Sequence, residues 1–501
     1  MGVSDVSAPG SGAGSSPGSG SGPSPKESRR WLQPRVPREQ LYRLSPRRPR
    51  PKRLGVYEFG DRVRFWIRAW WAWTGAAVAL VGTDHWYLAI PTGLAALVFY
   101  HTTPSYHPAA FPIETALTTG SPEFLRSMEG LTGTSLVEGN RVTIYNNGDE
   151  FYPAMLEAIE SAVESITLEQ YIFWDGQVGD RFAEAFAERA RRGVSVKLLV
   201  DGIGSASLGE RTLRVLEAGG VQLAWFHPVR WYTLDRANLR THRKTLVVDG
   251  RIVFTGGAGI ADQWLGSARD ATEWRDVAVS IEGPAALALQ AGFAQNWLIT
   301  TGEMVTGSGV FPLPDRVGEV RVQTILSSPS AGAGAAATMY LLALQCAERY
   351  LYIANPYFIP SAGVIELFAK ACRRGVQVKL MVAGPHNDTW WARQNSVRLY
   401  GRLLEAGVEI YEFAPSMLHQ KTMVVDGNWA TVGTTNFDNR SFALSEESNV
   451  CFHNRELVAE LGAIFEADLE RCERIDLGDW KRRGVWRRTQ ETIASLIEDQ
   501  V

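Results

Sequence analysis

The chain has 501 residues, 45% of them apolar and 21% charged, a composition that excludes an intrinsically disordered protein and leaves room for two ordinary domains. Its net charge of −3 is unevenly distributed, because residues 26–54 hold eleven Lys and Arg but only two Glu. That stretch is about +9 and the rest of the chain about −12, so the folded part is too acidic to favour nucleic-acid binding.

The N-terminal residues show no pattern of a folded element. Residues 1 to about 25 are rich in Gly, Ser and Pro, and the basic stretch follows, so we assign residues 1–62 to a disordered, basic N-terminal region. We expect no secretory signal, since no apolar core precedes a cleavage site. The spacing of the cysteines fits no zinc site, and we interpret them as reduced thiols of a cytosolic compartment: Cys346, Cys372, Cys451 and Cys472.

Two apolar, tryptophan-rich segments follow, residues 65–82 and 86–100, separated by Asp84 and His85. One helix over residues 69–100 would be roughly 48 Å long, more than the ~30 Å hydrocarbon core, and would bury both polar residues in it. We therefore predict a membrane hairpin or anchor over residues 63–104. A single tilted or partly inserted helix and a hairpin buried in a soluble protein are the alternatives.

The basic stretch before this hairpin indicates a cytoplasmic N-terminus, and a hairpin returns the chain to the same side. The predicted localisation is the cell membrane, with the two repeats that follow facing the cytoplasm. Residues 105–140, rich in Pro and then Gly, are predicted to be a connector.

The rest of the chain is a duplication. The sequence Arg-Arg-Gly-Val at 191–194 recurs at 373–376, and Leu-Glu-Ala-Gly at 216–219 recurs at 404–407. Each copy reads helix, strand, helix, strand, helix, strand and a further strand, which predicts an α/β fold. We expect two tandem repeats with mixed β-sheets flanked by helices, related by a pseudo-two-fold axis. The predicted segments are a first repeat (141–301), a linker (302–318), a second repeat (319–476) and a basic C-terminal tail (477–501).

Each copy carries the pattern H-x-K-x-x-x-x-D around an apolar run typical of a buried strand. Alternation along a strand would direct the His and the Lys to one face, while the Val run packs behind them and the Asp ends the strand. A two-fold pairing of the copies would bring both His–Lys pairs to one central cleft. The motif residues are His242, Lys244 and Asp249 in the first copy and His419, Lys421 and Asp426 in the second.

Two His–Lys pairs in one cleft suit phosphodiester chemistry. The lysines would stabilise the phosphate charge, one neutral imidazole would attack phosphorus, and the other would exchange protons with the alcohol. This requires different protonation states for the two histidines. We expect no metal site and no cofactor, because no ligand pattern for either occurs. The remaining histidines lack the motif and are interpreted as structural: His85, His101, His107, His227, His386 and His453.

The duplicated motif resembles that of the phospholipase D superfamily, over residues 141 to 475. The segments Thr241–Gly250 and Val432–Phe442 are most similar to its bacterial cardiolipin synthase branch. The resemblance implies phosphatidyl transfer between phospholipids, phosphatidylglycerol above all, with release of a headgroup alcohol such as glycerol. Its implied partners are phospholipid substrates and the membrane, without nucleic acid; the sequence leaves the oligomeric state open.

The resemblance also implies roles for individual residues. His242 would be the nucleophile, forming a phosphohistidine, and His419 the acid and base. Lys244 and Lys421 would hold the phosphate beside Asn436. The motif aspartates, Asp249 and Asp426, would be structural, and Glu447 and Asp276 would orient the histidines from behind.

One position departs from the family pattern. Gly259 stands where the second copy has Asn436, so the phosphate cradle is expected to be asymmetric or completed by a backbone N–H. Members of the superfamily also hydrolyse phospholipids to phosphatidic acid or cleave nucleic acids. A phospholipase D hydrolase, a nuclease-like phosphodiesterase and a non-catalytic lipid-binding protein are therefore the alternative functions.

Overall fold

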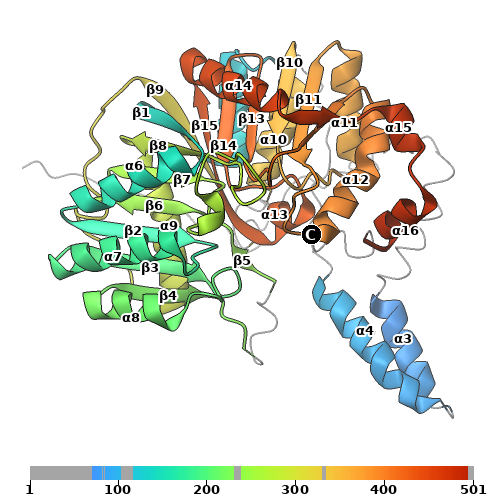
Figure 1. The fold of residues 1–501 in the computed structure, drawn as a ribbon, viewed down its shortest axis with the longest axis horizontal. Coiled ribbons are helices and arrows are strands. Elements are labelled where there is room, and N and C mark those ends of the chain that lie inside the picture. The colour runs from blue at the N-terminus through green and yellow to red at the C-terminus, as the bar shows by residue number, and fades with distance from the viewer. Residues whose placement is uncertain are drawn as a thin grey trace, which may run out of the picture. The chain divides into compact units, whose positions relative to one another are not determined.

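The computed structural model describes residues 70–81, 83, 85–102, 117–230, 238–329 and 334–494 (Figure 1). The predicted N-terminal region, residues 1–62, lies outside the described residues, as do residues 103–116 of the chain before the repeats.

The apolar segments form two helices, α3 (Trp70–Val81) and α4 (Ala89–Thr102), which pack against each other and are joined through the short 3-10 helix η1 (Trp86–Leu88). The chain thus breaks between the segments, as the hairpin prediction requires, and does not form the single helix of the alternative. With 12 and 14 residues the helices are about 18 and 21 Å long. Within the described ranges, no helix is both long and apolar enough to cross a membrane.

After α5 (Pro122–Thr132) the chain forms two halves with the predicted order of helices and strands. The first half consists of β1 (Leu136–Asn146), α6 (Gly148–Ser161), β2 (Ser165–Gln170), α7 (Gln177–Arg191), β3 (Ser195–Asp201), α8 (Glu210–Gly219), β4 (Gln222–Phe226), β5 (Arg240–Thr241), β6 (Thr245–Val248), β7 (Ile252–Gly256), η3 (Asp262–Trp264), β8 (Val277–Glu282) and α9 (Ala286–Thr301).

The second half repeats this order and ends in two short helices. It consists of β9 (Val320–Ser327), α10 (Ala335–Cys346), β10 (Tyr350–Ala354), α11 (Ala362–Arg373), β11 (Gln377–Ala383), α12 (Trp390–Glu405), β12 (Glu409–Phe413), β13 (Thr422–Val425), β14 (Trp429–Gly433), α13 (Asn439–Ala443), β15 (Ser445–His453), α14 (Arg455–Leu469), β16 (Cys472–Arg474), α15 (Leu477–Lys481) and α16 (Val485–Ala494).

The strands of both halves belong to one mixed sheet with a two-fold order. From its centre, β1 is followed by β8, β7, β6, β2, β3 and β4, and β9 by the equivalent β15, β14, β13, β10, β11 and β12. Strands β1 and β9 pair with each other in the middle. The predicted α/β class and the pseudo-two-fold relation of two repeats are therefore confirmed. The predicted start of the first repeat, residue 141, falls inside β1.

Alternation along the motif strands buries both of their faces. In β6, Leu246 and Val248 enter the core of the first half, whereas Val247 enters a cluster shared by the two halves. In β13, Val424 enters the same shared cluster. This apolar layer behind the motifs joins the halves, because large apolar side chains gain most from burial.

The motif histidines and lysines do not lie in these strands, contrary to the prediction. Strands β6 and β13 begin at Thr245 and Thr422, each one residue after the motif lysine. The histidines and lysines occupy the segments that lead into the strands. The N–H groups of both histidines are bonded by the opposite half of the molecule, whereas the Lys421 carbonyl still accepts from Gly433 of β14.

Candidate active site

Each motif is attached through its backbone to the other half. Strand β5, just before the first motif, pairs in parallel with β15 of the second half, and the His242 N–H donates to the Glu446 carbonyl at 2.9 Å. In the same way the His419 N–H donates to the carbonyl of Arg275, a first-half residue, at 2.8 Å. These crossed contacts fix the position of each imidazole relative to the opposite half.

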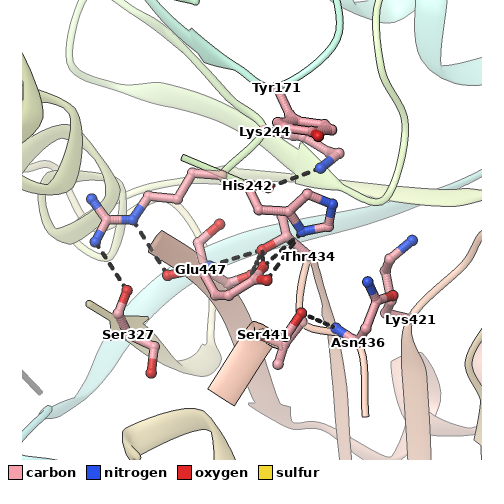
Figure 2. Close-up of polar contacts among 12 residues, drawn as sticks. Tyr171, His242, Lys244, Ser327, Lys421, Thr434, Asn436, Ser441 and Glu447 are labelled. Atoms are coloured by element: carbon pink, nitrogen blue, oxygen red, sulfur yellow. Dashed lines mark hydrogen bonds and ion pairs between the residues drawn. The ribbon is translucent and has the colours of Figure 1, made fainter. Parts of the chain in front are cut away.

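Each motif imidazole is also held by a carboxylate of the opposite half. Figure 2 shows the contact of His242 with Glu447, in which Nδ1 lies 3.0 Å from Oε2. His419 Nδ1 lies 2.9 Å from Asp276 Oδ2. Both carboxylates are fully buried. A carboxylate on Nδ1 orients the ring and leaves Nε2 as the reactive nitrogen. The two predicted orienting residues therefore make the expected kind of contact, each with the histidine of the other half.

Both lysines act electrostatically on the first-half motif. Burial lowers the pKa of Lys244 to about 7, and the Lys421 ammonium adds to this effect. Burial likewise lowers the pKa of Lys421 to about 8. The charges of both lysines also depress the pKa of His242. Each motif histidine is also bonded to the opposite half, so the two motifs share one site, and its two lysines suit an anion.

Burial is also the main cause that lowers the pKa of each motif histidine, to about 4 for both His242 and His419. Lys421 contributes at His419, where its Nζ lies 3.1 Å from Nδ1 and 3.2 Å from Nε2. Both imidazoles are therefore neutral near pH 7 in this structure. An anionic phosphate beside the lysines would offset their charge and raise the pKa of a histidine that has to donate a proton.

The phosphate side of the site differs between the halves. Asn436 is buried beside Lys421 (Figure 2), and its backbone N–H donates to Ser441 Oγ at 3.2 Å. Its side-chain Oδ1 has no hydrogen-bond partner among the described groups. At the equivalent Gly259, a Cβ would lie 2.8 Å from the Trp264 ring and 2.9 Å from Ile172 Cβ. The predicted asymmetry is therefore steric: an aromatic ring fills the space of the missing asparagine.

Different donors also hold the two orienting carboxylates. The indole N–H of Trp264 donates to Asp276 Oδ2 at 3.0 Å, the same oxygen that contacts His419, and the two rings meet edge to face at 5.2 Å. In the other half the Thr434 hydroxyl donates to Glu447 Oε2. One histidine thus lies against an indole, whereas the carboxylate of the other is bonded by a small hydroxyl.

The motif aspartates point into backbone turns. Asp249 Oδ1 accepts from the N–H groups of Glu164 at 2.7 Å and Ser165 at 2.8 Å, at the start of β2. Asp426 Oδ1 accepts from those of Arg349 at 2.8 Å and Tyr350 at 3.0 Å, at the start of β10. Such contacts tie the end of the motif strand to the start of its neighbour, as expected for structural residues.

No group of His, Cys, Asp and Glu side chains that could hold a metal ion occurs in the part of the chain that the structure describes.

The comparisons with known proteins agree with this geometry. The family model described as "Cardiolipin synthase, PLD-like domain" matches residues 155–297 and 340–469, which cover more than half of the chain and both motifs. The chain belongs to this family.

Individual members of the cardiolipin synthase family are similar over most of the chain. A cardiolipin synthase of a Geobacillus species is 34% identical over 371 residues, which cover 74% of this chain and 73% of that protein. The probable cardiolipin synthase YwiE of Bacillus subtilis is 30% identical over 359 residues, 72% of each chain. Among solved structures, the phosphatidylserine synthase of Haemophilus influenzae superposes with a TM-score of 0.58 at 13% identity, covering 76% of this chain and all of that one. This last likeness concerns the fold.

Several residues at the site were not predicted. Thr434, Trp264 and Tyr171 bear on the histidines or their carboxylates, and the Tyr171 ring meets the His242 ring at 5.2 Å. Thr434 lies two residues before Asn436, and Trp264 five residues after Gly259. Their closeness in sequence to the predicted phosphate cradle could have indicated that they belong to the site. Only the fold shows which atoms they contact.

Proposed function

We propose that this protein is a membrane-bound phosphatidyltransferase of cardiolipin synthase type. It would join two phosphatidylglycerol molecules, or one with another phospholipid, and release a headgroup alcohol such as glycerol. Membership of the cardiolipin synthase family supports the reaction class. The observation that carries the proposal is the crossed arrangement in which each motif histidine meets a buried carboxylate of the opposite half.

The proposed reaction has two displacements at phosphorus. The bound phosphate raises the pKa of His419, which takes up a proton. Neutral His242 attacks through Nε2, the P–N bond forms, the P–O bond to the first headgroup breaks, and protonated His419 gives its proton to the leaving oxygen. The hydroxyl of a second phospholipid then attacks, its proton passes to His419, and the P–N bond breaks. Glu447 stabilises the positive charge that develops on His242 in the first step.

The lysines supply the charge that this transition state needs. In the proposal Lys244 and Lys421 hold the non-bridging phosphate oxygens, with the Asn436 side chain as a further donor. Preorganised donors in a buried site stabilise developing charge more strongly than water does, because they need no reorganisation. Their lowered pKa values imply a further property. A bound phosphodiester anion would favour the charged form of both lysines, and binding would weaken above about pH 7–8.

The α3–α4 hairpin suits an anchor that enters one leaflet. Neither helix contains Asp, Glu, Lys or Arg. Their outward residues are large and apolar, with Val78 70%, Ile90 64% and Leu94 58% exposed. Burying such surface in lipid is favourable. In the proposal the hairpin holds the catalytic halves at the cytoplasmic face of the cell membrane.

A reconstituted assay tests the proposal. Purified protein in mixed micelles of detergent and phosphatidylglycerol should form cardiolipin and equimolar glycerol, and the His242→Ala variant should form neither. Lipid extracts of a cardiolipin-deficient host should show the same difference between the intact protein and the variant. Phosphatidic acid as the sole product would replace the proposal with a phospholipase D hydrolase. Cleavage of DNA without lipid turnover would replace it with a nuclease.

A further inference from the structure

A carboxylate without a basic partner lies in the loop between β11 and α12. Asp388 is exposed, and its Oδ1 accepts a hydrogen bond from the hydroxyl of the half-buried Tyr357. Among the described residues, no lysine or arginine forms an ion pair with it. An exposed carboxylate that is neither paired nor part of a helix cap has no evident structural role here, since α12 is preceded by Thr389 and has no side-chain cap.

This carboxylate belongs to the surroundings of the site. Its partner Tyr357 precedes Phe358, which pairs with Phe437, the residue after Asn436 of the phosphate cradle. Asp388 is therefore held on the side of the site where the second motif stands, and its charge raises the pKa of both His419 and Lys421. A negative charge there opposes the binding of phosphate, which the lysines favour. A carboxylate accepts hydrogen bonds, so Asp388 suits a substrate group that lies next to the phosphate and donates hydrogen bonds.

The first half lacks this acidic pair. Ile172 is the equivalent of Tyr357, because the next residue of each, Phe173 and Phe358, forms the corresponding bridge. The loop after β3, residues 202–209, is longer than the loop after β11 and contains no Asp or Glu. The acidic side of the site would contact a polar part of a lipid substrate, and the opposite side an apolar part.

We propose that Asp388 and Tyr357 form a subsite for the free hydroxyl groups of a polyol headgroup, such as the glycerol of phosphatidylglycerol. This inference rests on the proposed function. In the first displacement the subsite holds the glycerol whose P–O bond breaks, and in the second it holds the glycerol whose hydroxyl attacks. Both alcohols exchange a proton with His419 on the same side of phosphorus, so one subsite serves both steps. The carboxylate accepts hydrogen bonds from the hydroxyls that do not react.

Competition between two alcohols tests the subsite. Isotope-labelled glycerol and 1-propanol, which have the same carbon chain but three hydroxyls and one, compete for the phosphatidyl group in phosphatidylglycerol micelles. Mass spectrometry gives the ratio of labelled phosphatidylglycerol to phosphatidylpropanol. Asp388→Asn should lower this ratio about tenfold, because a charged hydrogen bond to a substrate hydroxyl is lost. Both products form from the same phosphatidyl-enzyme, so a slower first displacement lowers both equally and the ratio reports on the acceptor alone. Tyr357→Phe should lower it by a smaller factor in the same direction.

Asp479→Asn is the matched control, since Asp479 is also an exposed carboxylate of the second half, in α15, and should leave the ratio unchanged. An unchanged ratio in Asp388→Asn, or an equal fall of both products, would overturn the subsite. A loss of preference for ethanolamine over propanol, with the glycerol preference intact, would assign the carboxylate to cationic headgroups and also overturn it. The ratio compares phosphatidylglycerol with phosphatidylpropanol, and neither product is cardiolipin. The assay therefore tests the subsite even if the protein makes no cardiolipin.

Discussion

Asp249 and Asp426, the aspartates of the two motifs, make almost the same contacts, although the rest of the site differs between the halves. Each has a positive φ, 51° and 55°, and each receives backbone N–H groups from the start of the neighbouring strand. The backbone N–H of each motif histidine is likewise bonded to a carbonyl of the other half. The repeats are thus equivalent in the contacts that shape the backbone.

The groups around the histidines are different. The orienting carboxylate is Glu447, bonded by Thr434, in one case, and Asp276, bonded by Trp264, in the other. One half offers an amide at Asn436, and the equivalent Gly259 leaves no room for a side chain. The two-fold fold brings the two imidazoles together. The different roles of the two histidines depend on the side chains around them, which differ between the halves.

The histidines themselves provide the strongest test of this comparison. His242→Ala should abolish transfer, by about 10⁵-fold or more, and form no covalent intermediate, because the nucleophile is lost. His419→Ala should lose about 10²- to 10⁴-fold, yet accumulate a slowly formed phosphatidyl-enzyme, since only the proton transfers are impaired. Intact-protein mass spectrometry after a rapid alkaline quench, with phosphatidylglycerol as donor, measures the adduct.

Both variants should unfold at nearly the temperature of the parent protein, which the same samples can show. An adduct on His419 in the His242→Ala variant would reverse the two roles. Equal behaviour of both variants would mean that the unequal linings do not distinguish the histidines.

Exchange of the orienting carboxylates for amides should have a smaller effect. Glu447→Gln and Asp276→Asn keep the shape of the side chain but cannot stabilise an imidazolium, so each should slow turnover roughly 10- to 100-fold. In Glu447→Gln the formation of the covalent intermediate should be the slowed step. In Asp276→Asn the proton transfers of both steps should be slowed. Single-turnover kinetics separate these cases, and the same slowed step in both variants would contradict the crossed assignment.

Much of this arrangement was predictable from the sequence, for a physical reason. Duplication and motif spacing are local patterns, so they predicted the α/β halves and their two-fold relation. Strand alternation was wrong for the motif histidines and lysines, which precede β6 and β13. The crossing of the carboxylates was not predictable, because Glu447 and Asp276 contact histidines 205 and 143 residues away. Spacing showed that Gly259 lacks an amide, but which side chain fills the space depends on the packing of Trp264. Helix lengths, which depend on where the chain bends, left α3 and α4 shorter than a bilayer-spanning hairpin needs.

The subtlest expected effect concerns Trp264, whose indole N–H shares the oxygen of Asp276 that contacts His419. Trp264→Phe keeps an aromatic ring beside Gly259 but removes this donor. A carboxylate that loses a donor attracts a proton on its neighbour more strongly, so the pKa of His419 should rise. One hydrogen bond corresponds to about half to one pH unit. In the second displacement neutral His419 is the base, so the acid limb of the kcat/KM profile for the acceptor should move upward by that amount.

Trp274→Phe serves as the control for this shift. The Trp274 ring lies 5.5 Å from the His419 ring, but its indole makes no bond to Asp276. It should therefore leave the acid limb in place. A limb that moves equally in both variants would trace the effect to the general packing around His419. A limb that moves only in Trp264→Phe would show that the residue filling the space of the missing asparagine also tunes the acid and base of the reaction.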